Sequence, residues 1–551
     1  MPPIRPQDQL ASHDVFNQPP PLNDFNAFDR DLPLKAALMR AGGGEHGERL
    51  STFGKRVGSA EAIEWGRLAN ENPPKLKSFD RFGHRLDEVE FHPAYHELMC
   101  LGIEGGVAAA AWTTEQAGHP LHAALLYLMT QADAGTVCPM SMTYAVVPAL
   151  RAEPDVSAEW EPRVVSGSYD QRFIPAGGKS GATMGMAMTE KQGGSDVRAN
   201  TTRAHPLGNG EYELTGHKWF CSAPMSDAFL TLAYAEGGLT CFLVPRWRPD
   251  GSRNALHIMR LKDKLGDRSN ASSEIEYHGA WARRIGEEGR GIRTIIEMVQ
   301  GTRLDCIAGS AGGMRAALTQ AIWHTRHRSA FQRVLSDQPA MRGVLADLAL
   351  ESEAASAVMM RVAAAFDAAR SGKEGEAAFA RLATPIAKYW VCKRQPGFVY
   401  EALECLGGAG YVEEGPMPRL FRQSPLNAIW EGSGNVIALD VLRALNSEPE
   451  AWEMFRAELD RAAGAHPQLD AAIQRLYADL SDATLTDAGA RRFVEGAALA
   501  LQAACLSHAD SAVFSGFCEA RLDPEKRSFQ YGASGAALDM DKLLMRALPV
   551  D

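Results

Sequence analysis

The spacing of apolar residues along the chain changes twice. From about residue 31 to residue 150, long stretches rich in Ala, Leu and Met, such as His119 to Ala134, are punctuated by Gly and Pro and predict helices. Between about 186 and 283 short alternating runs predict β-strands at 212–214, 229–234, 240–244 and 273–277. After Gly291 the helical spacing returns, and one face of a bundle helix carries Val344, Leu348, Glu351, Ala355, Met359, Val362 and Phe366.

These changes predict a multidomain chain that is mainly α with a small β-domain. Its 551 residues exceed the roughly 250 to 300 that one core supports. The proline-rich stretch from Pro2 to about Asn26 is expected to form an extended arm, and 446–449 a linker. The predicted domains are residues 1–185 (arm and helices), 186–290 (β-domain), 291–445 (helical bundle) and 446–551 (C-terminal helices).

Composition indicates a soluble cytoplasmic protein. The chain is 45% hydrophobic and 23% charged, and no apolar run approaches the roughly 18 residues of a membrane span. Its first residues do not resemble a secretory signal. Nine scattered cysteines favour reduced, mostly buried thiols, and no residue spacing indicates a metal site. The net charge of −11 argues against a surface that attracts polyanions as a whole.

Three distant segments carry the candidate chemistry: residues 188–196 (MTEKQGGSD), 216–222 (GHKWFCS) and 429–435 (IWEGSGN). Glycines in the first two permit close approach to a planar, phosphate-bearing ligand, and hydroxyls and amides can meet its polar edge. The third holds a lone carboxylate, Glu431, between apolar residues and a turn that can fix its position and basicity.

Each segment alone also permits a structural interpretation. The first can be a Gly-Gly turn with Ser195 or Asp196 as a helix N-cap. Trp219 and Phe220 can belong to the core of the sheet, and Glu431 can cap a helix that begins near Gly434. No G-x-G-x-x-G follows a strand, so a Rossmann dinucleotide site is not expected.

In this order the segments resemble those of the acyl-CoA dehydrogenase superfamily of flavoproteins. Residues 15–23 (VFNQPPPLN), 66–74 (GRLANENPP) and 90–96 (EFHPAYH) resemble its alkylation-response (AidB) type. The resemblance implies the acyl-CoA dehydrogenase fold of a helical domain, a β-domain and a four-helix bundle, extended by C-terminal helices. It also implies FAD as cofactor.

The resemblance assigns site residues as well. Beside FAD within the subunit it implies Met188, Thr189, Gly194, Ser195, Trp219, Phe220, Ser222, Ser433 and Asn435. Arg328 and Phe331, with Gln332 in place of the family's glycine, resemble an element that reaches the FAD of a neighbouring subunit. Gly407 and Gly408 begin a segment that resembles the family's loop against the adenosine part of the neighbouring subunit's FAD. Cofactor binding would then require an oligomer, expected to be a homotetramer.

The reaction implied is removal of an α-proton from an acyl-CoA-like substrate by Glu431 while a hydride passes to FAD. Arg303 resembles an arginine near the CoA end of the cleft, although an ordinary helix-surface arginine explains it equally well.

The AidB type also implies a DNA-associated flavoprotein with little acyl-CoA turnover, protecting against alkylation. Arg443, Arg521 and Arg527 are its candidate contacts with duplex DNA. Residues 446–551, however, contain ten Lys or Arg against seventeen Asp or Glu, whereas duplex binding relies on basic residues. A structural oligomer with an idle flavin is a third hypothesis.

Overall fold

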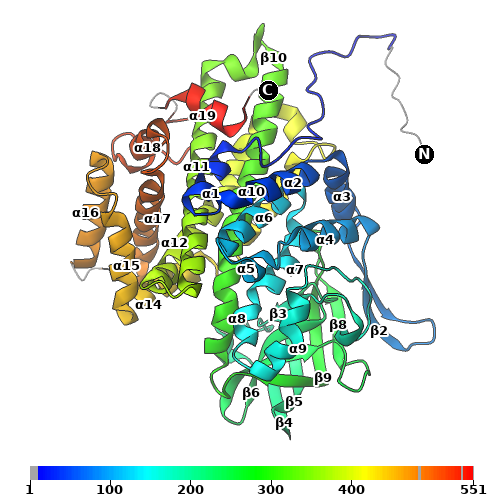
Figure 1. Cartoon of the computed structure of the whole chain (residues 1–551). Coiled ribbons are helices and arrows are strands. Elements are labelled where there is room, and N and C mark those ends of the chain that lie inside the picture. The colour runs from blue at the N-terminus through cyan, green and yellow to red at the C-terminus, as the bar shows by residue number, and fades with distance from the viewer. Residues whose placement is uncertain (1–9, 482–484, 535–537, 550–551) are drawn as a thin grey trace.

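Long central helices dominate the computed structural model, which describes residues 10–481, 485–534 and 538–549. A β-domain lies at one end of these helices, and a second group of helices packs along one side of them (Figure 1). The mainly helical architecture with a small β-domain confirms the prediction from the hydrophobic pattern. No helix in the described ranges combines the length and apolarity needed to cross a bilayer.

The N-terminal part begins with an arm that has neither helix nor strand in its described residues before Leu32. The first helix starts where Asp31 accepts a hydrogen bond from the Leu34 backbone N–H at 3.0 Å. The following helices are α1 (Leu32–Arg40), α2 (Gly47–Val57), α3 (Ala60–Glu71), α4 (Pro93–Gly105), α5 (Ala110–Thr113), α6 (Gly118–Ala132), α7 (Ala134–Ala145), α8 (Val147–Leu150) and α9 (Pro154–Val164).

One β-hairpin interrupts these helices and was not predicted. Strands β1 (Lys75–Phe79) and β2 (Arg85–Glu90) pair antiparallel and project from the side of the molecule (Figure 1). Residues of β1 alternate between exposed and half-buried, and none is fully buried. Only half-buried Leu76 of β1 packs against the core of the β-domain, so the sequence of β1 lacks the apolar alternation from which a strand is predicted.

The β-domain closes on itself as a small barrel. Its strand order is β3-β6-β4-β5-β9-β7, β7 also pairs with β6, and β8 pairs with β9. All four predicted strands lie inside β5, β6, β7 and β9. The strands are β3 (Met184–Ala187), β4 (Arg203–Gly208), β5 (Glu211–Ser222), β6 (Ala228–Ala235), β7 (Gly238–Pro245), β8 (Leu256–Leu261) and β9 (Ser272–Ile285).

The central bundle contains three very long helices. The predicted apolar face lies on α11, where Leu348, Met359 and Val362 are completely buried. Helices α10 and α6 pack so closely that a Cβ on Gly312 would lie 2.4 Å from the Tyr127 carbonyl oxygen. The bundle helices are α10 (Gly291–His327), α11 (Pro339–Arg370), α12 (Glu376–Glu404), α13 (Met417–Gln423) and α14 (Gly434–Ser447). A short hairpin, β10 (Ser329–Ala330) with β11 (Arg333–Val334), joins α10 to α11.

The C-terminal helices pack on α11, α12 and α14. The predicted linker at 446–449 is wrong: Asn446 and Ser447 end α14, and α15 begins at Pro449. A proline is tolerated in the first turn of a helix, so it starts α15 at once. The proposed domain boundaries stay predictions. The helices are α15 (Pro449–Asp460), α16 (Pro467–Ser481), α17 (Ala490–Leu506), α18 (Ser511–Phe517) and α19 (Met540–Ala547).

Candidate active site

A buried ion pair joins the first two candidate segments. Lys218 on β5 donates to the Glu190 carboxylate at 2.9 Å, and neither side chain is exposed. The hydroxyl of Thr202 and the backbone N–H of Thr201 donate to Glu190 at 2.6 and 2.7 Å. Burial opposes ionisation of Glu190, yet Lys218 and these donors hold its pKa well below the usual range. Glu190 of the first motif and Lys218 of the second therefore hold the loop after β3 against strand β5.

The backbone also links these segments, because the Trp219 N–H donates to the Thr189 carbonyl at 2.8 Å. Gly194 lies so close to Thr189 that a Cβ there would come within 2.4 Å of the Thr189 hydroxyl. Met188 and Thr189 are half-buried, whereas Ser195 is exposed. The N-cap interpretation holds for Asp196, whose side chain accepts from the Arg198 N–H at a single 3-10 turn.

An aromatic surface adjoins this loop. Phe220 is 49% exposed, so the sheet-core interpretation fails for it. The ammonium of Lys262 lies 3.3 Å from the ring centroid of half-buried Trp219 and 4.7 Å from that of Phe220. Farther along β5, the Ser222 hydroxyl lies 3.1 Å from that of Ser272. Strand β5 thus carries an exposed aromatic ring, Phe220, and a hydroxyl group, Ser222, two residues apart.

Glu431 does not cap α14. Its Oε2 accepts a hydrogen bond of 2.8 Å from the Thr302 hydroxyl on α10, and the N-cap of α14 is Ser433. The backbone at Glu431 is left-handed, with φ of +56°, which is uncommon for a residue other than glycine. Burial raises the pKa of Glu431, while Thr302, Arg303 and Lys388 oppose the rise.

Two basic side chains hold the loop that carries Glu431. Arg303 donates from Nε to the Glu431 carbonyl at 3.2 Å and pairs with Asp440 on α14 at 2.8 Å. Lys388 on α12 donates to the carbonyls of Trp430 and Gly432 at 2.8 and 2.5 Å. Arg303 is only 5% exposed, so the interpretation as an ordinary surface arginine is wrong. Its predicted role near the CoA end of a cleft stays a prediction.

The Cys138 thiol on α7 is influenced by groups from two parts of the chain. Burial raises its pKa to about 12, Lys264 and Ser222 lower it, and the Glu431 charge raises it further.

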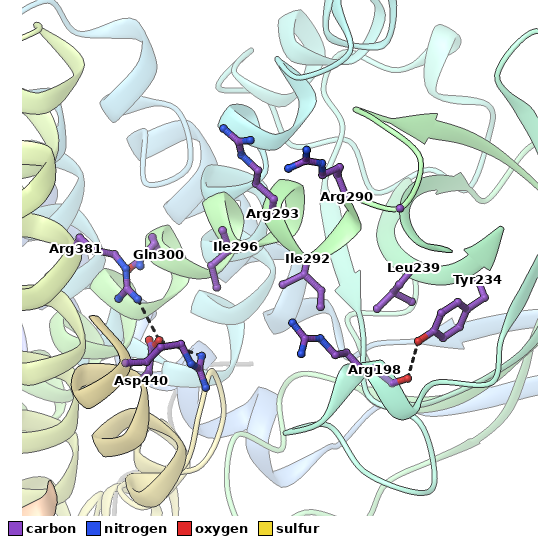
Figure 2. A pocket seen from close by; sticks show the side chains of 12 residues that line it. Arg198, Tyr234, Leu239, Arg290, Ile292, Arg293, Ile296, Gln300, Arg381 and Asp440 are labelled. Atoms are coloured by element: carbon purple, nitrogen blue, oxygen red, sulfur yellow. Dashed lines mark hydrogen bonds and ion pairs between the residues drawn. The ribbon is translucent and has the colours of Figure 1, made fainter. Parts of the chain in front are cut away.

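A cationic cleft of about 510 Å³ opens between the β-domain and the bundle (Figure 2). Its arginines come from the turn after the first motif, the start of α10, α12 and α14, and Figure 2 labels Arg198, Arg290, Arg293 and Arg381 among the lining side chains. Asp440, in its wall, accepts from Arg381 at 3.2 Å and from Arg303, which ties the cleft to the Glu431 loop. The cleft is lined by Arg198, Tyr234, Leu239, Gly289, Arg290, Ile292, Arg293, Ile296, Gln300, Arg381, Asp440 and Arg443.

Sequence reasoning missed four of these five cleft arginines. Only Arg443 was singled out, and then for DNA. Arg198 and Arg381 lie singly in unrelated segments, so no local pattern marks them. Arg290 and Arg293, three residues apart at the predicted start of a helix beside the β-domain, were the signal available.

Other predicted cofactor residues lie on exposed turns. Phe331 is 94% exposed at the tip of the β10–β11 hairpin, at the opposite end of the molecule from the β-domain (Figure 1). Phe331 and Gln332 both have positive φ, +52° and +61°, so Gln332 adopts the conformation that the family's glycine favours. Gly407 and Gly408 are exposed, as are Ser433 and Asn435 beside Glu431. Their contacts with a cofactor stay predictions.

The three arginines predicted to contact DNA differ in accessibility. Arg521 is 1% exposed and pairs with Asp347 and Glu351 of α11, so the prediction that it contacts DNA is wrong. Arg443 and Arg527 are exposed, and Arg443 pairs weakly with Asp440 at 3.6 Å. DNA association through these two residues stays a prediction. Duplex binding that weakens steeply with salt would support it.

Three segments of the chain match domains of known proteins. Residues 17–171 match the N-terminal domain of the adaptive response protein AidB, and residues 185–280 and 289–446 match the middle and C-terminal domains of acyl-CoA dehydrogenases. The chain is 47% identical to AidB of Escherichia coli K12, covering 85% of this chain and 87% of that protein. It is 30% identical to acyl-CoA dehydrogenase family member 11 of Caenorhabditis elegans, covering 88% and 77%.

A solved structure shows the same fold. It is that of Caenorhabditis elegans ACDH-11 in complex with C11-CoA, which superposes with a TM-score of 0.84 at 26% identity and covers 98% of this chain and 94% of that one. The fold is therefore that of acyl-CoA dehydrogenases, extended by C-terminal helices. The predicted resemblance is confirmed, and the chain belongs to the acyl-CoA dehydrogenase superfamily, within its AidB type.

Proposed function

We propose that this protein is an FAD-dependent oxidoreductase that acts on an acyl-CoA-like thioester, with Glu431 as its general base. The observation that carries the proposal is the placement of Glu431. A carboxylate with a raised pKa is held by Thr302 on a loop anchored by Arg303 and Lys388. A base of this kind can remove a weakly acidic proton.

The residues around β5 suit FAD. Phe220 offers an exposed aromatic face to a planar ring, and Thr189 and Ser222 offer hydroxyl groups to its polar edge. Exposed Ser195 beside Gly193 and Gly194 suits a diphosphate, because backbone can approach closely there. When bound, FAD would supply the hydride acceptor for the reaction.

Glu431 would act through its free oxygen. Within the described part of the chain Oε1 makes no hydrogen bond, whereas Oε2 is held by Thr302. The α-proton of the thioester would pass to Oε1 while Thr302 keeps the carboxyl group oriented. Burial of the carboxylate strengthens it as a base, since the neutral form is favoured there.

The arginine cleft suits the phosphates of coenzyme A. Among the described residues Arg198 and Arg293 pair with no carboxylate, so their charges are available to a ligand. Arginine binds phosphate in a bidentate manner. Asp440 in the wall of the cleft pairs with Arg303, and Arg303 in turn binds the Glu431 carbonyl. A nucleotide in the cleft and an acyl group near Glu431 could therefore belong to one molecule. The ACDH-11 protein, which shares this fold, was solved in complex with an acyl-CoA.

A homotetramer would complete the cofactor site. Phe331 is 94% exposed and Tyr411, next to the Gly407–Gly410 turn, is 82% exposed. Both side chains lie on turns that resemble the family's inter-subunit elements, so they are available to a neighbouring subunit. Sedimentation that gives a monomer retaining full FAD content would contradict this part of the proposal.

The test is anaerobic mixing of the FAD-loaded protein with a panel of acyl-CoA thioesters, followed by flavin absorbance. We expect at least one thioester to bleach the flavin and Glu431→Gln to slow bleaching by at least roughly a hundredfold. Glu297→Gln, the same substitution at an exposed position of α10, is the matched control and should bleach normally. Unchanged bleaching in Glu431→Gln, or no bleaching by any thioester, would refute the proposal.

A further inference from the structure

A lysine on the loop between β8 and β9 is connected by hydrogen bonds to a serine at the end of β5. Lys264 donates from Nζ to the Ser272 hydroxyl at 3.3 Å, and the Ser272 hydroxyl lies 3.1 Å from that of Ser222. Ser222 and Ser272 stand directly opposite each other where β5 pairs with β9. The three side chains therefore form one continuous chain of hydrogen bonds from the loop to β5.

The loop that carries Lys264 is fixed against the neighbouring helices. Ser269 donates to the carboxylate of Asp133, the N-cap of α7, at 2.7 Å. A Cβ on Gly266 would lie 2.5 Å from the carbonyl oxygen of Arg422 on α13, so the loop touches that helix closely. Lys264 is itself half-buried. Its ammonium group is thus held in one place by a loop that packs on two helices.

The positive charge of Lys264 is offered to neutral oxygens. Within the part of the chain that the structure describes, its hydrogen bonds go to the Ser272 hydroxyl and, at 2.8 Å, to the Asn270 carbonyl, and no carboxylate forms an ion pair with it. Lys262, two residues earlier, instead pairs with Glu274 at 2.7 Å. Burial lowers the pKa of Lys264, and the charge of Asp267 opposes this change.

The chemistry of the three groups sets the direction of the hydrogen bonds. An ammonium group only donates, so the Ser272 oxygen accepts from Lys264. Among the described residues Ser222 is the other hydrogen-bond partner of the Ser272 side chain, which is 6% exposed. If Ser222 donated to Ser272, the buried Ser272 proton would lack an acceptor, which is unfavourable. Ser272 therefore donates to Ser222, and the Ser222 proton points away from Ser272.

Two acceptors can receive the Ser222 proton. One is the Cys138 thiol, whose pKa Ser222 lowers by hydrogen bonding. Sulfur is a weak acceptor, however. The other is the polar edge of FAD, which is proposed to lie beside Ser222.

We propose that Lys264 and Ser272 are positioning residues that set the Ser222 hydroxyl as a hydrogen-bond donor to FAD. The inference rests on the proposed placement of FAD beside Ser222 and is independent of the role of Glu431. Acceptance of a hydride adds negative charge to the flavin ring. A donor backed by a cation therefore stabilises reduced FAD more than oxidised FAD, and Lys264 and Ser272 raise the reduction potential.

The experiment measures the midpoint reduction potential of the FAD-loaded protein with a chemical reductant, so it requires no thioester. Lys264→Met and Ser272→Ala should each make the potential at least about 30 mV more negative, which is a tenfold change in the equilibrium constant of a two-electron couple. Lys264→Arg keeps the charge and should recover part of the shift. Ser273→Ala is the matched control on β9, because its hydroxyl donates instead to the Cys221 carbonyl, and its potential should match the wild type.

A second pair of variants tests whether Lys264 acts through Ser222. In a Ser222→Ala background, Lys264→Met should shift the potential less than it does in the wild type. If Lys264→Met fails to fold or to bind FAD, Ser272→Ala decides, because it leaves the bond from Lys264 to the Asn270 carbonyl in place.

An equal shift by Lys264→Met in both backgrounds would show that the lysine acts by its charge alone and would overturn the inference. A wild-type potential in Ser272→Ala would also overturn it. Neither result bears on proton removal by Glu431, which the bleaching of flavin by thioesters tests separately.

Discussion

At the scale of single residues, the backbone of Glu431 is strained in a way that serves its position. A left-handed conformation costs a residue other than glycine about 1 kcal/mol or more and persists only where the surroundings enforce it. Arg303 binds the Glu431 carbonyl and Lys388 binds the carbonyls on either side. These contacts keep the carboxylate aimed at Thr302.

Thr302→Val should raise the pKa of Glu431. The Thr302 hydroxyl donates to the ionised carboxylate, and its loss favours the protonated form. Burial already raises this pKa, and a base works only when ionised, so flavin reduction by a thioester should increase as pH rises through it. In Thr302→Val that increase should move to higher pH. Stopped-flow reduction at a series of pH values measures the shift.

Thr302→Ser is the control for this prediction because it keeps the hydroxyl group. It should restore the wild-type pH profile, even if its smaller side chain changes the maximal rate. If Val and Ser variants both keep the wild-type profile, the hydrogen bond does not set the basicity of Glu431.

The sequence identified Glu431 but not the side chains that hold it. Its motif is local, so a resemblance finds it. Thr302 and Lys388 lie 129 and roughly 40 residues away and contact it only after the bundle has folded. Arg303 was predicted as a site residue because its segment resembles a family motif. Its burial and its pairing with Asp440, however, depend on the position of α14.

At the scale of elements, the Glu190–Lys218 pair fastens the loop after β3 to strand β5. Lys218→Met would leave the Glu190 carboxylate buried without its cation, which should lower the free energy of unfolding by about 3 to 5 kcal/mol. Urea denaturation followed by circular dichroism measures the change. Flavin content should also fall, because both elements carry predicted cofactor contacts.

Two further variants make this prediction specific. Glu190→Gln combined with Lys218→Met removes both charges and should recover part of the loss. Arg67→Met, which breaks the exposed pairs with Glu64 and Glu71 on α3, should cost at most about 1 kcal/mol. If Arg67→Met lowered the free energy of unfolding as much as Lys218→Met does, the prediction that the buried pair contributes more than the exposed pairs would be contradicted.

Two of the strands that the sequence missed, β1 and β4, share a physical cause. Strands β1 and β4 bury few side chains: β1 has no fully buried residue and β4 has only Ala204. Pro206 also stands inside β4 and argues against a strand when only sequence is considered. The strands β5, β6, β7 and β9 were predicted because at least one face of each enters the core of the barrel. Alternation thus reveals strands with one buried face, whereas the four-residue β3 has buried residues on both faces and shows no alternation.

At the scale of the whole molecule, Arg521 holds the C-terminal helices on the bundle. It pairs with Asp347 and Glu351, which in turn binds Arg394 at 3.3 Å. Glu351 thus stands on a face of α11 that is otherwise mostly apolar, with two arginines to neutralise it. The sequence placed Glu351 on this face but gave no partner, because Arg521 lies 170 residues away.

Arg521→Met should leave two buried carboxylates without their shared cation. We expect the free energy of unfolding to fall by about 3 to 5 kcal/mol. The C-terminal helices should also unfold locally before the bundle does, which is measured as faster hydrogen exchange in α17 and α18 than in α10. Exposed Arg527→Met, the matched control, should change neither stability nor exchange. Wild-type exchange of α17 in Arg521→Met would show that apolar packing alone holds these helices.

The central claim is that Glu431 removes a proton from the α-carbon of a thioester bound beside the flavin. Mass spectrometry of an acyl-CoA incubated with the FAD-loaded protein in D2O tests it most directly, because α-proton exchange reports the base without requiring net oxidation. The account predicts deuterium at the α-carbon with the wild type and with Glu297→Gln, and at least roughly a hundredfold slower incorporation with Glu431→Gln. Incorporation at the wild-type rate by Glu431→Gln would contradict it.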